Sequence, residues 1–139
     1  MSWENEYKSK LTTAEKAVEL IKSGNRVVIG HACAEPSYLV DAMVANAESY
    51  HDVEIVHMVA MGKAGYAQPG MESHFRHNAL FVGGTTRKAV AEGRGDYTPC
   101  FFYRIPSLFT NGSLPVDVAL VQATPPDENG NMSLGISVD

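Results

Sequence analysis

The chain has 139 residues, of which 45% are hydrophobic, and this suits one α/β-sized domain rather than two. Its formal net charge is −5 and its calculated isoelectric point is about 5.5, so it lacks the positive field that attracts nucleic acid. Apolar runs end before the roughly 20 residues of a membrane span, and residues 1–6 do not resemble a signal peptide, so we expect a cytoplasmic protein without nucleic-acid or membrane partners.

The first predicted element is a helix near the amino terminus. Between Thr12 and Ser23 the apolar residues recur at the spacing of one helical face. Thr12 and Glu15 have the spacing of a capping box, and Gly24 is typical of the residue that ends a helix. We therefore expect a helix over residues 12–23.

A strand, a loop and a second helix are expected next. Residues 26–30 form a short β-branched run that ends in glycine, which is typical of a strand. The loop of residues 31–35 leads to Pro36, a residue that suits the first turn of a helix. We expect that helix to extend to about Ala47.

Two further strands and a helix continue the alternation. Residues 53–60 are mostly apolar, as in a strand that is covered on both faces of a parallel sheet. A glycine-containing loop at residues 61–70 precedes the next predicted strand, at residues 79–82. After the glycine pair at residues 83–84, the pattern predicts a helix over residues 85–92.

The last two predicted strands complete the sheet. They cover residues 99–104 and 116–123, and a short helix is expected between them, after Pro106 and Ser107. Residues 132–139 have the pattern of the opening of another strand. Five strands that alternate with helices predict an α/β fold with a three-layer, mostly parallel sheet and helices on both faces.

The loops that follow the strands are the expected position of a site, because open parallel sheets bind ligands beyond the carboxyl ends of their strands. The loop after residues 79–82 has the clearest chemistry. Its glycine pair lets a ligand approach the backbone, the next helix directs N–H groups toward an anion, and Arg87 adds a positive charge. The same residues also suit an ordinary turn capped by Thr85 or Thr86, so both interpretations stay open.

Histidine and glutamate residues offer two further candidates. His31 and Glu35 have the chemistry of an acid/base pair, but Glu35, directly before Pro36, also suits the amino terminus of a helix. His74 and His77 have i, i+3 helical spacing without a third ligand nearby in the sequence. We therefore expect a solvated helix face at these two histidines and no metal site.

Six stretches cover nearly the whole chain: residues 23–36 (SGNRVVIGHACAEP), 41–47 (DAMVANA), 56–63 (VHMVAMGK), 86–93 (TRKAVAEG), 97–108 (YTPCFFYRIPSL) and 116–130 (VDVALV through PPDENG). They resemble successive landmarks of the acetyl-CoA hydrolase/transferase family and occur in the family's order. Within the family, the sequence is most similar to 4-hydroxybutyrate CoA-transferases, with butyryl-CoA:acetate CoA-transferases close behind.

The resemblance implies an enzyme that moves CoA between short-chain carboxylates, with acyl-CoA and a carboxylate as substrates and no added cofactor. In this family a glutamate of the second α/β domain forms a glutamyl-CoA thioester. That glutamate belongs beyond residue 139. The resemblance therefore implies that residues 1–139 are an amino-terminal α/β domain, cut before the catalytic domain and without a catalytic residue of its own.

The family's active site lies between its two domains, so the resemblance places the strand-end loops along one wall of a cleft. A sheet cut at this point also predicts a partner, either the carboxy-terminal domain or subunit or another copy of the chain in a homo-oligomer. Two other functions stay open: acyl-CoA hydrolysis, and a non-catalytic domain that binds CoA or another anion or is purely structural. The expected substrate-binding residues are His31, Glu35, Met61, Thr85, Thr86 and Arg87.

Overall fold

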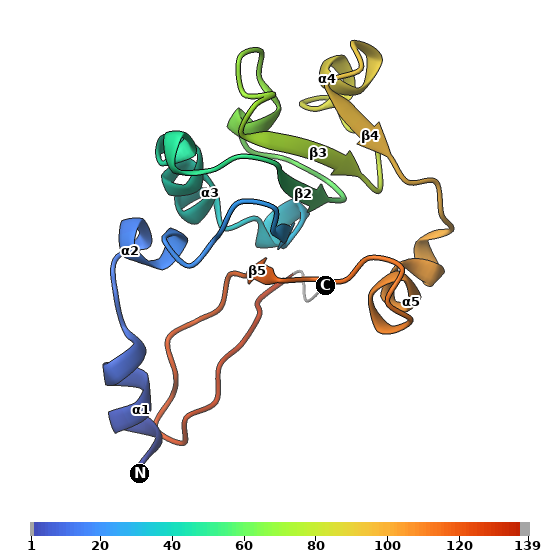
Figure 1. The fold of residues 1–139 in the computed structure, drawn as a ribbon. Helices are drawn as coiled ribbons and strands as arrows, with labels where there is room; N and C mark the ends of the chain where they lie inside the picture. The colour runs from blue at the N-terminus through green and yellow to red at the C-terminus, as the bar shows by residue number, and fades with distance from the viewer. Residues whose placement is uncertain (1, 137–139) are drawn as a thin grey trace.

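The computed structural model describes residues 2–136, which form one parallel sheet with surrounding helices (Figure 1). The five strands lie in the order β4-β3-β2-β1-β5, and every neighbouring pair is parallel. This confirms the predicted α/β sheet. The strands are β1 (Arg26–Ile29), β2 (Val53–His57), β3 (Phe75–Ala79), β4 (Gly95–Tyr97) and β5 (Val118–Leu120).

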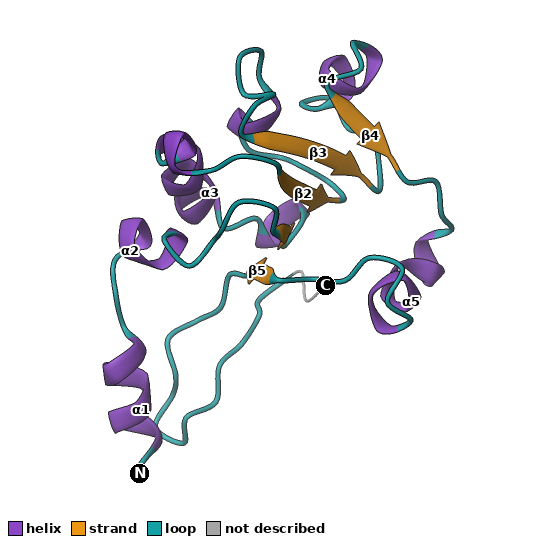
Figure 2. Cartoon of the chain, viewed as in Figure 1, coloured by secondary structure: helices purple, strands orange, loops and turns teal. Residues whose placement is uncertain are grey.

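Helices cover both faces of the sheet, as predicted (Figure 2). They are α1 (Trp3–Lys10), α2 (Ala14–Val18), α3 (Ser37–Ala45), α4 (Arg87–Ala91) and α5 (Ile105–Thr110). Side chains alternate between the two faces along a strand. Val27 belongs to the main core with Met43 of α3, whereas its neighbour Val28 belongs to a smaller cluster with Phe109 of α5.

The first predicted helix is shorter than expected. α2 ends at Val18 rather than near Ser23, and α1 precedes it. The apolar pattern did not predict α1 because none of its residues is buried. The predicted capping box is wrong, because Thr13, not Thr12, is the N-cap, and its hydroxyl accepts a hydrogen bond of 3.3 Å from the Lys16 N–H.

The third and fourth strands lie earlier in the chain than predicted. β3 ends where the predicted strand at residues 79–82 begins. β4 ends before the predicted strand at residues 99–104, which instead contains the 3₁₀ helix η4 (Phe102–Arg104). The helical interpretation of His74 and His77 is therefore wrong, because His77 lies inside β3 and is 1% exposed.

The short helix expected after Pro106 and Ser107 begins before them, since α5 starts at Ile105, and the other predicted elements are present in shorter form. α3 and α4 lie within the predicted helices at residues 36–47 and 85–92, and β5 lies within the predicted strand at residues 116–123. In the predicted strand opening at residues 132–139, the described part has no strand and ends in a turn, and the remainder lies outside the described residues. No helix within residues 2–136 has the length and apolar character needed to cross a membrane.

Candidate functional site

Three of the predicted site loops meet at the carboxyl edge of the sheet. Glu35 follows β1, and its Oε2 atom accepts hydrogen bonds of 2.8 Å from the backbone N–H groups of both Met61 and Gly62, which follow β2. From the other side, the hydroxyl of Thr85, which follows β3, donates a hydrogen bond of 2.7 Å to the carbonyl oxygen of Ala60. The structure thus brings together the predicted residues Glu35, Met61 and Thr85.

Residues 60–62, called the central segment below, are held by both neighbouring loops. Glycine is suited to position 62, because a Cβ at Gly62 would lie only 2.3 Å from Oε1 of Glu35. Met61 is 66% exposed, although its backbone N–H is bound by the buried carboxylate. The central segment is therefore fixed through its backbone and presents one apolar side chain to the outside.

Glu35 is turned toward the central segment rather than toward its own helix. It is 7% exposed, and the N-cap of α3 is Pro36, which has no side-chain capping bond. The capping role considered for Glu35 is therefore wrong. The 3₁₀ helix η1 (Ala32–Ala34) accounts for its direction, because the Ala32 N–H donates to the Val59 carbonyl oxygen at 2.9 Å and holds the turn beside the end of β2.

A buried histidine and tyrosine lie next to Glu35. His57 Nδ1 and the Tyr66 hydroxyl share a hydrogen bond of 2.7 Å, and His57 Nε2 lies 4.0 Å from Oε2 of Glu35. Burial lowers the pKa of His57 to about 3, with smaller contributions from the neighbouring His77 and His31, so the imidazole is neutral. Burial, and to a lesser extent the charge of Glu35, raises the pKa of Tyr66.

Sequence reasoning missed this buried cluster. The Tyr66 ring centroid lies 6.2 Å from that of His57 and 5.5 Å from that of His77. Tyr66 comes from the 3₁₀ helix η3 (Gly65–Ala67), and the two histidines come from neighbouring strands, so no local spacing reveals their contact. The one available signal was a single histidine that interrupts the apolar run of β2. Among the described residues, Nε2 of each histidine is buried without a hydrogen-bond partner.

The other predicted site residues surround this centre. Thr86 is 2% exposed and is the N-cap of α4, without a side-chain capping bond. Arg87, the first residue of α4, is exposed, and its backbone N–H donates to the Gly83 carbonyl oxygen at 2.9 Å. A Cβ at Gly83 or Gly84 would meet nothing within 4 Å, so open space lies beside this glycine pair. Anion binding by this loop stays a prediction.

An apolar cavity of about 530 Å³ lies beside the ends of β1 and β2, on the face of the sheet that α5 covers. Its lining includes Val56 of β2, Leu80 just after β3, Phe109 of α5, and His31 of the loop after β1. Such a lining suits an aliphatic group better than a charged one. This end of the domain therefore has an apolar cavity in addition to the exposed cationic side chain of Arg87.

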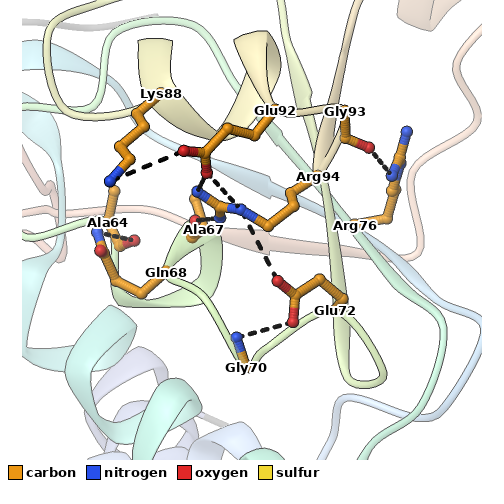
Figure 3. A network of polar contacts seen from close by, with 10 residues as sticks. All are labelled: Ala64, Ala67, Gln68, Gly70, Glu72, Arg76, Lys88, Glu92, Gly93 and Arg94. Carbon is orange, nitrogen blue, oxygen red and sulfur yellow. Dashed lines mark hydrogen bonds and ion pairs between the residues drawn. The ribbon is translucent and has the colours of Figure 1, made fainter.

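A network of polar contacts holds the outer side of the loop that carries Tyr66 (Figure 3). Arg94 donates hydrogen bonds to the Ala67 carbonyl oxygen and, at 2.6 Å, to Oε2 of Glu92. Its guanidinium also lies 3.8 Å from Oε1 of Glu72. The network connects η3 with α4 and with the start of β4, so η3 is held from outside by Arg94 and from inside by the bond to His57.

The side chains at this edge divide into two groups. The carboxylate of Glu35 and the hydroxyl of Thr85 are engaged within the protein, whereas Met61 and Arg87 are exposed. Within residues 2–136, no three His, Cys, Asp or Glu side chains lie close enough together to hold a metal ion. The carboxyl edge of the sheet thus exposes the apolar side chain of Met61 and the cationic side chain of Arg87.

Comparison with known proteins gives a consistent result. Residues 1–139 match the family model described as the acetyl-CoA hydrolase/transferase N-terminal domain. A 4-hydroxybutyrate coenzyme A transferase of Clostridium kluyveri is 60% identical over 139 residues, which are 100% of this chain and 32% of that protein. A butyryl-CoA:acetate CoA-transferase of Anaerostipes caccae is 31% identical, over 99% of this chain and 31% of that protein.

The same likeness extends to a solved structure. The crystal structure of a 4-hydroxybutyrate CoA-transferase from Porphyromonas gingivalis matches with a TM-score of 0.78 and 32% sequence identity. The match covers 99% of this chain and 31% of that one. The chain thus spans about a third of the length of the relatives that it matches.

Proposed function

Because the chain belongs to the acetyl-CoA hydrolase/transferase family, we propose that it is the amino-terminal domain of a CoA-transferase that moves CoA between short-chain carboxylates. The proposed substrates are acyl-CoA thioesters and carboxylates of the 4-hydroxybutyrate, butyrate and acetate type. The observation that carries this proposal is the 60% identity, over all 139 residues, to a protein named for 4-hydroxybutyrate CoA transfer.

The proposed reaction uses a glutamate of the enzyme and no added cofactor. The glutamate carboxylate attacks the carbonyl carbon of the acyl-CoA, which gives a mixed anhydride and releases the CoA thiolate. The thiolate then attacks the glutamyl carbonyl of the anhydride, which leaves a glutamyl-CoA thioester and frees the first carboxylate. The second carboxylate reverses these steps. Exclusion of water from the anhydride preserves the free energy of the thioester.

We place the nucleophilic glutamate outside this chain, in the part that the relatives have in addition. The chain spans 32% of one relative and 31% of another, so most of such a protein lies elsewhere. The glutamates beside the sheet already have partners. Glu35 accepts two backbone N–H groups, and Glu54 pairs with Arg26 at 2.7 Å and accepts from Asn78 at 2.8 Å.

The carboxyl edge of the sheet is the proposed wall of the active-site cleft. Its support is the convergence of three strand-end loops on the central segment, because ligands of parallel sheets bind beyond that edge. Arg87 is exposed on this wall and is suited to a substrate carboxylate or a CoA phosphate. His31, Met61, Thr85 and Thr86 are proposed to lie along the same wall.

The isolated chain tests where the nucleophile lies. Purified residues 1–139 are mixed with acetyl-CoA or butyryl-CoA and with 4-hydroxybutyrate or acetate, and the formation of the second thioester is followed by chromatography. Intact-mass measurement detects any covalent CoA adduct on the chain. We expect neither transfer nor adduct. Turnover together with an adduct on one of its own glutamates would contradict the placement of the nucleophile outside the chain.

Acyl-CoA hydrolysis is the second candidate, because the family description names hydrolases as well as transferases. In the natural polypeptide that contains this chain, a hydrolase releases CoA without an acceptor carboxylate, whereas a transferase requires the acceptor.

A partner is also proposed, either the carboxy-terminal domain or another copy of the chain. The exposed aromatic side chains of Phe101, Phe102 and Tyr103 support it. The cytoplasmic location stays a prediction.

A further inference from the structure

Glu35 is a buried charge that its own helix does not require. Its side chain is 3% exposed, and within residues 2–136 no lysine or arginine forms an ion pair with it. Removing a carboxylate from water is unfavourable unless hydrogen bonds or opposite charges compensate. The nearby imidazole of His57 is neutral, so the compensation comes from the two N–H groups of the central segment. Apolar residues of similar volume often replace buried ion pairs without loss of stability, so packing alone does not require a carboxylate at this position.

The contact between Glu35 and the central segment depends on three separate features. The carboxylate holds the N–H groups of Met61 and Gly62, each at 2.8 Å. Thr85 holds the carbonyl oxygen of Ala60 from the opposite loop at 2.7 Å. The missing side chain of Gly62 leaves the space that Oε1 of Glu35 occupies. Because these features come from different loops, the segment has one defined position relative to the sheet edge.

The exposed part of the central segment is the side chain of Met61. It is 66% exposed at the edge proposed to face the cleft, and its backbone is the part that Glu35 holds. A displacement of the Met61 backbone moves this side chain by the same amount, and displacements of about 1 Å change reaction rates strongly. By holding the backbone of Met61, the buried carboxylate of Glu35 thus determines where the exposed Met61 side chain lies.

Resting on the proposed function, we propose that Glu35 is a positioning residue of the CoA-transfer site. Its carboxylate fixes the central segment and thereby sets the place of Met61 on the wall of the cleft. In this role Glu35 does not touch substrate, in contrast to the substrate contact expected for it from the resemblance. Met61 and the backbone around it are the parts that meet substrate.

The first test measures amide hydrogen exchange of the 139-residue chain by NMR. In Glu35→Ala, the amides of Met61 and Gly62 should exchange about 10- to 100-fold faster than in the wild type, the effect of losing hydrogen bonds to a charged acceptor. Glu35→Gln keeps the reach and an acceptor oxygen, so its effect should be smaller. Glu35→Asp keeps the charge but is one methylene shorter, so its amides should exchange faster than those of Glu35→Gln.

Two further variants sharpen this test. Gly62→Ala leaves Glu35 unchanged but puts a methyl group where its Oε1 lies, so the amide of Met61 should again exchange faster. Glu128→Ala, at an exposed position after β5, should leave both amides unchanged. If Glu35→Ala fails to fold, the order of Glu35→Asp and Glu35→Gln decides. Wild-type exchange in Glu35→Asp, or slower exchange there than in Glu35→Gln, would overturn the proposal.

The second test measures CoA transfer by the natural polypeptide. A positioning residue predicts that kcat/KM falls about tenfold or more in Glu35→Asp, and less in Glu35→Gln, in the same order as the amide exchange. Unchanged kinetics in a variant whose amides exchange faster would overturn the role in the site. A wild-type polypeptide without any CoA transfer would instead overturn the proposed function, and the amide exchange would still decide whether Glu35 fixes the central segment.

Discussion

Burial keeps the imidazole of His57 neutral, and this makes the fold sensitive to acid. The pKa of His57 is lowered from 6.5 to about 3 in the folded protein, chiefly by burial. Between these two values the unfolded chain binds more protons than the folded one, so stability is fully present above about pH 6.5 and is lost as the pH falls toward 3. Burial lowers the pKa of His77 too, which acts in the same direction.

This predicts a specific change in the pH dependence of stability. In His57→Asn, the free energy of unfolding should fall less steeply with decreasing pH than in the wild type, by up to about 1.4 kcal/mol per pH unit between pH 6 and 4. Urea unfolding at several pH values measures this slope. His51→Asn, at an exposed histidine, is the matched control and should keep the wild-type slope. Parallel curves for His57→Asn and the wild type would contradict a neutral, buried His57.

The residues of the candidate site show what could be predicted from the sequence and what could not. Glu35, Met61 and Thr85 each follow a predicted strand, and the structure brings them together. Their contacts were not predictable, because each joins loops far apart in the chain. The hydrogen bond between His57 and Tyr66 was not predictable for a similar reason, because it joins a side chain of β2 to one of η3 and no local pattern shows that these two elements meet.

At the scale of the elements, η3 is held by contacts with other parts of the chain. It carries Tyr66 into the core, and the Arg94 guanidinium holds its end through the Ala67 carbonyl oxygen. The Arg94 side chain is 15% exposed, so water competes little for its hydrogen bonds. Arg76 offers a comparison, because it also pairs with a carboxylate, that of Asp96, but is 45% exposed.

Replacement of these two arginines by lysine should therefore have unequal effects. Arg94→Lys keeps the charge but loses the planar donors, and we expect the free energy of unfolding to fall by about 1–2 kcal/mol. Arg76→Lys should cost less than about 1 kcal/mol, as for exposed ion pairs. Urea denaturation of both variants measures the difference. Equal losses would show that the Arg94 network does not hold η3.

The strand positions illustrate the limits of apolar pattern at the element scale. The apolar run at residues 79–82 predicts the third strand there, yet β3 precedes it and contains the buried polar residues His77 and Asn78. Both contacts are with the neighbouring strand β2: His77 Nδ1 pairs with the Ile55 carbonyl oxygen at 3.2 Å, and Asn78 donates to Glu54 at 2.8 Å. Polar residues whose partners lie on a neighbouring strand, more than 20 residues away in the sequence, hide a strand from any local pattern.

For the whole molecule, the alternation of strands and helices was sufficient to predict the α/β sheet. The alternation was not sufficient to predict that the helices cover the two faces of the sheet unequally. α2, α3 and α4 supply buried residues to one core, whereas on the opposite face α5 leaves the cavity of about 530 Å³. The resemblance supplied what pattern could not, namely the family and the expectation that a second domain carries the nucleophile.

Exchange of domains tests whether this chain serves as the amino-terminal domain of a CoA-transferase. The segment of the Clostridium kluyveri relative that aligns with this chain is replaced by residues 1–139, and CoA transfer from butyryl-CoA to 4-hydroxybutyrate and acetate is measured. We predict that the chimeric protein transfers CoA, whereas residues 1–139 alone do not. A chimera that elutes and unfolds like the parent enzyme but transfers no CoA would contradict the account.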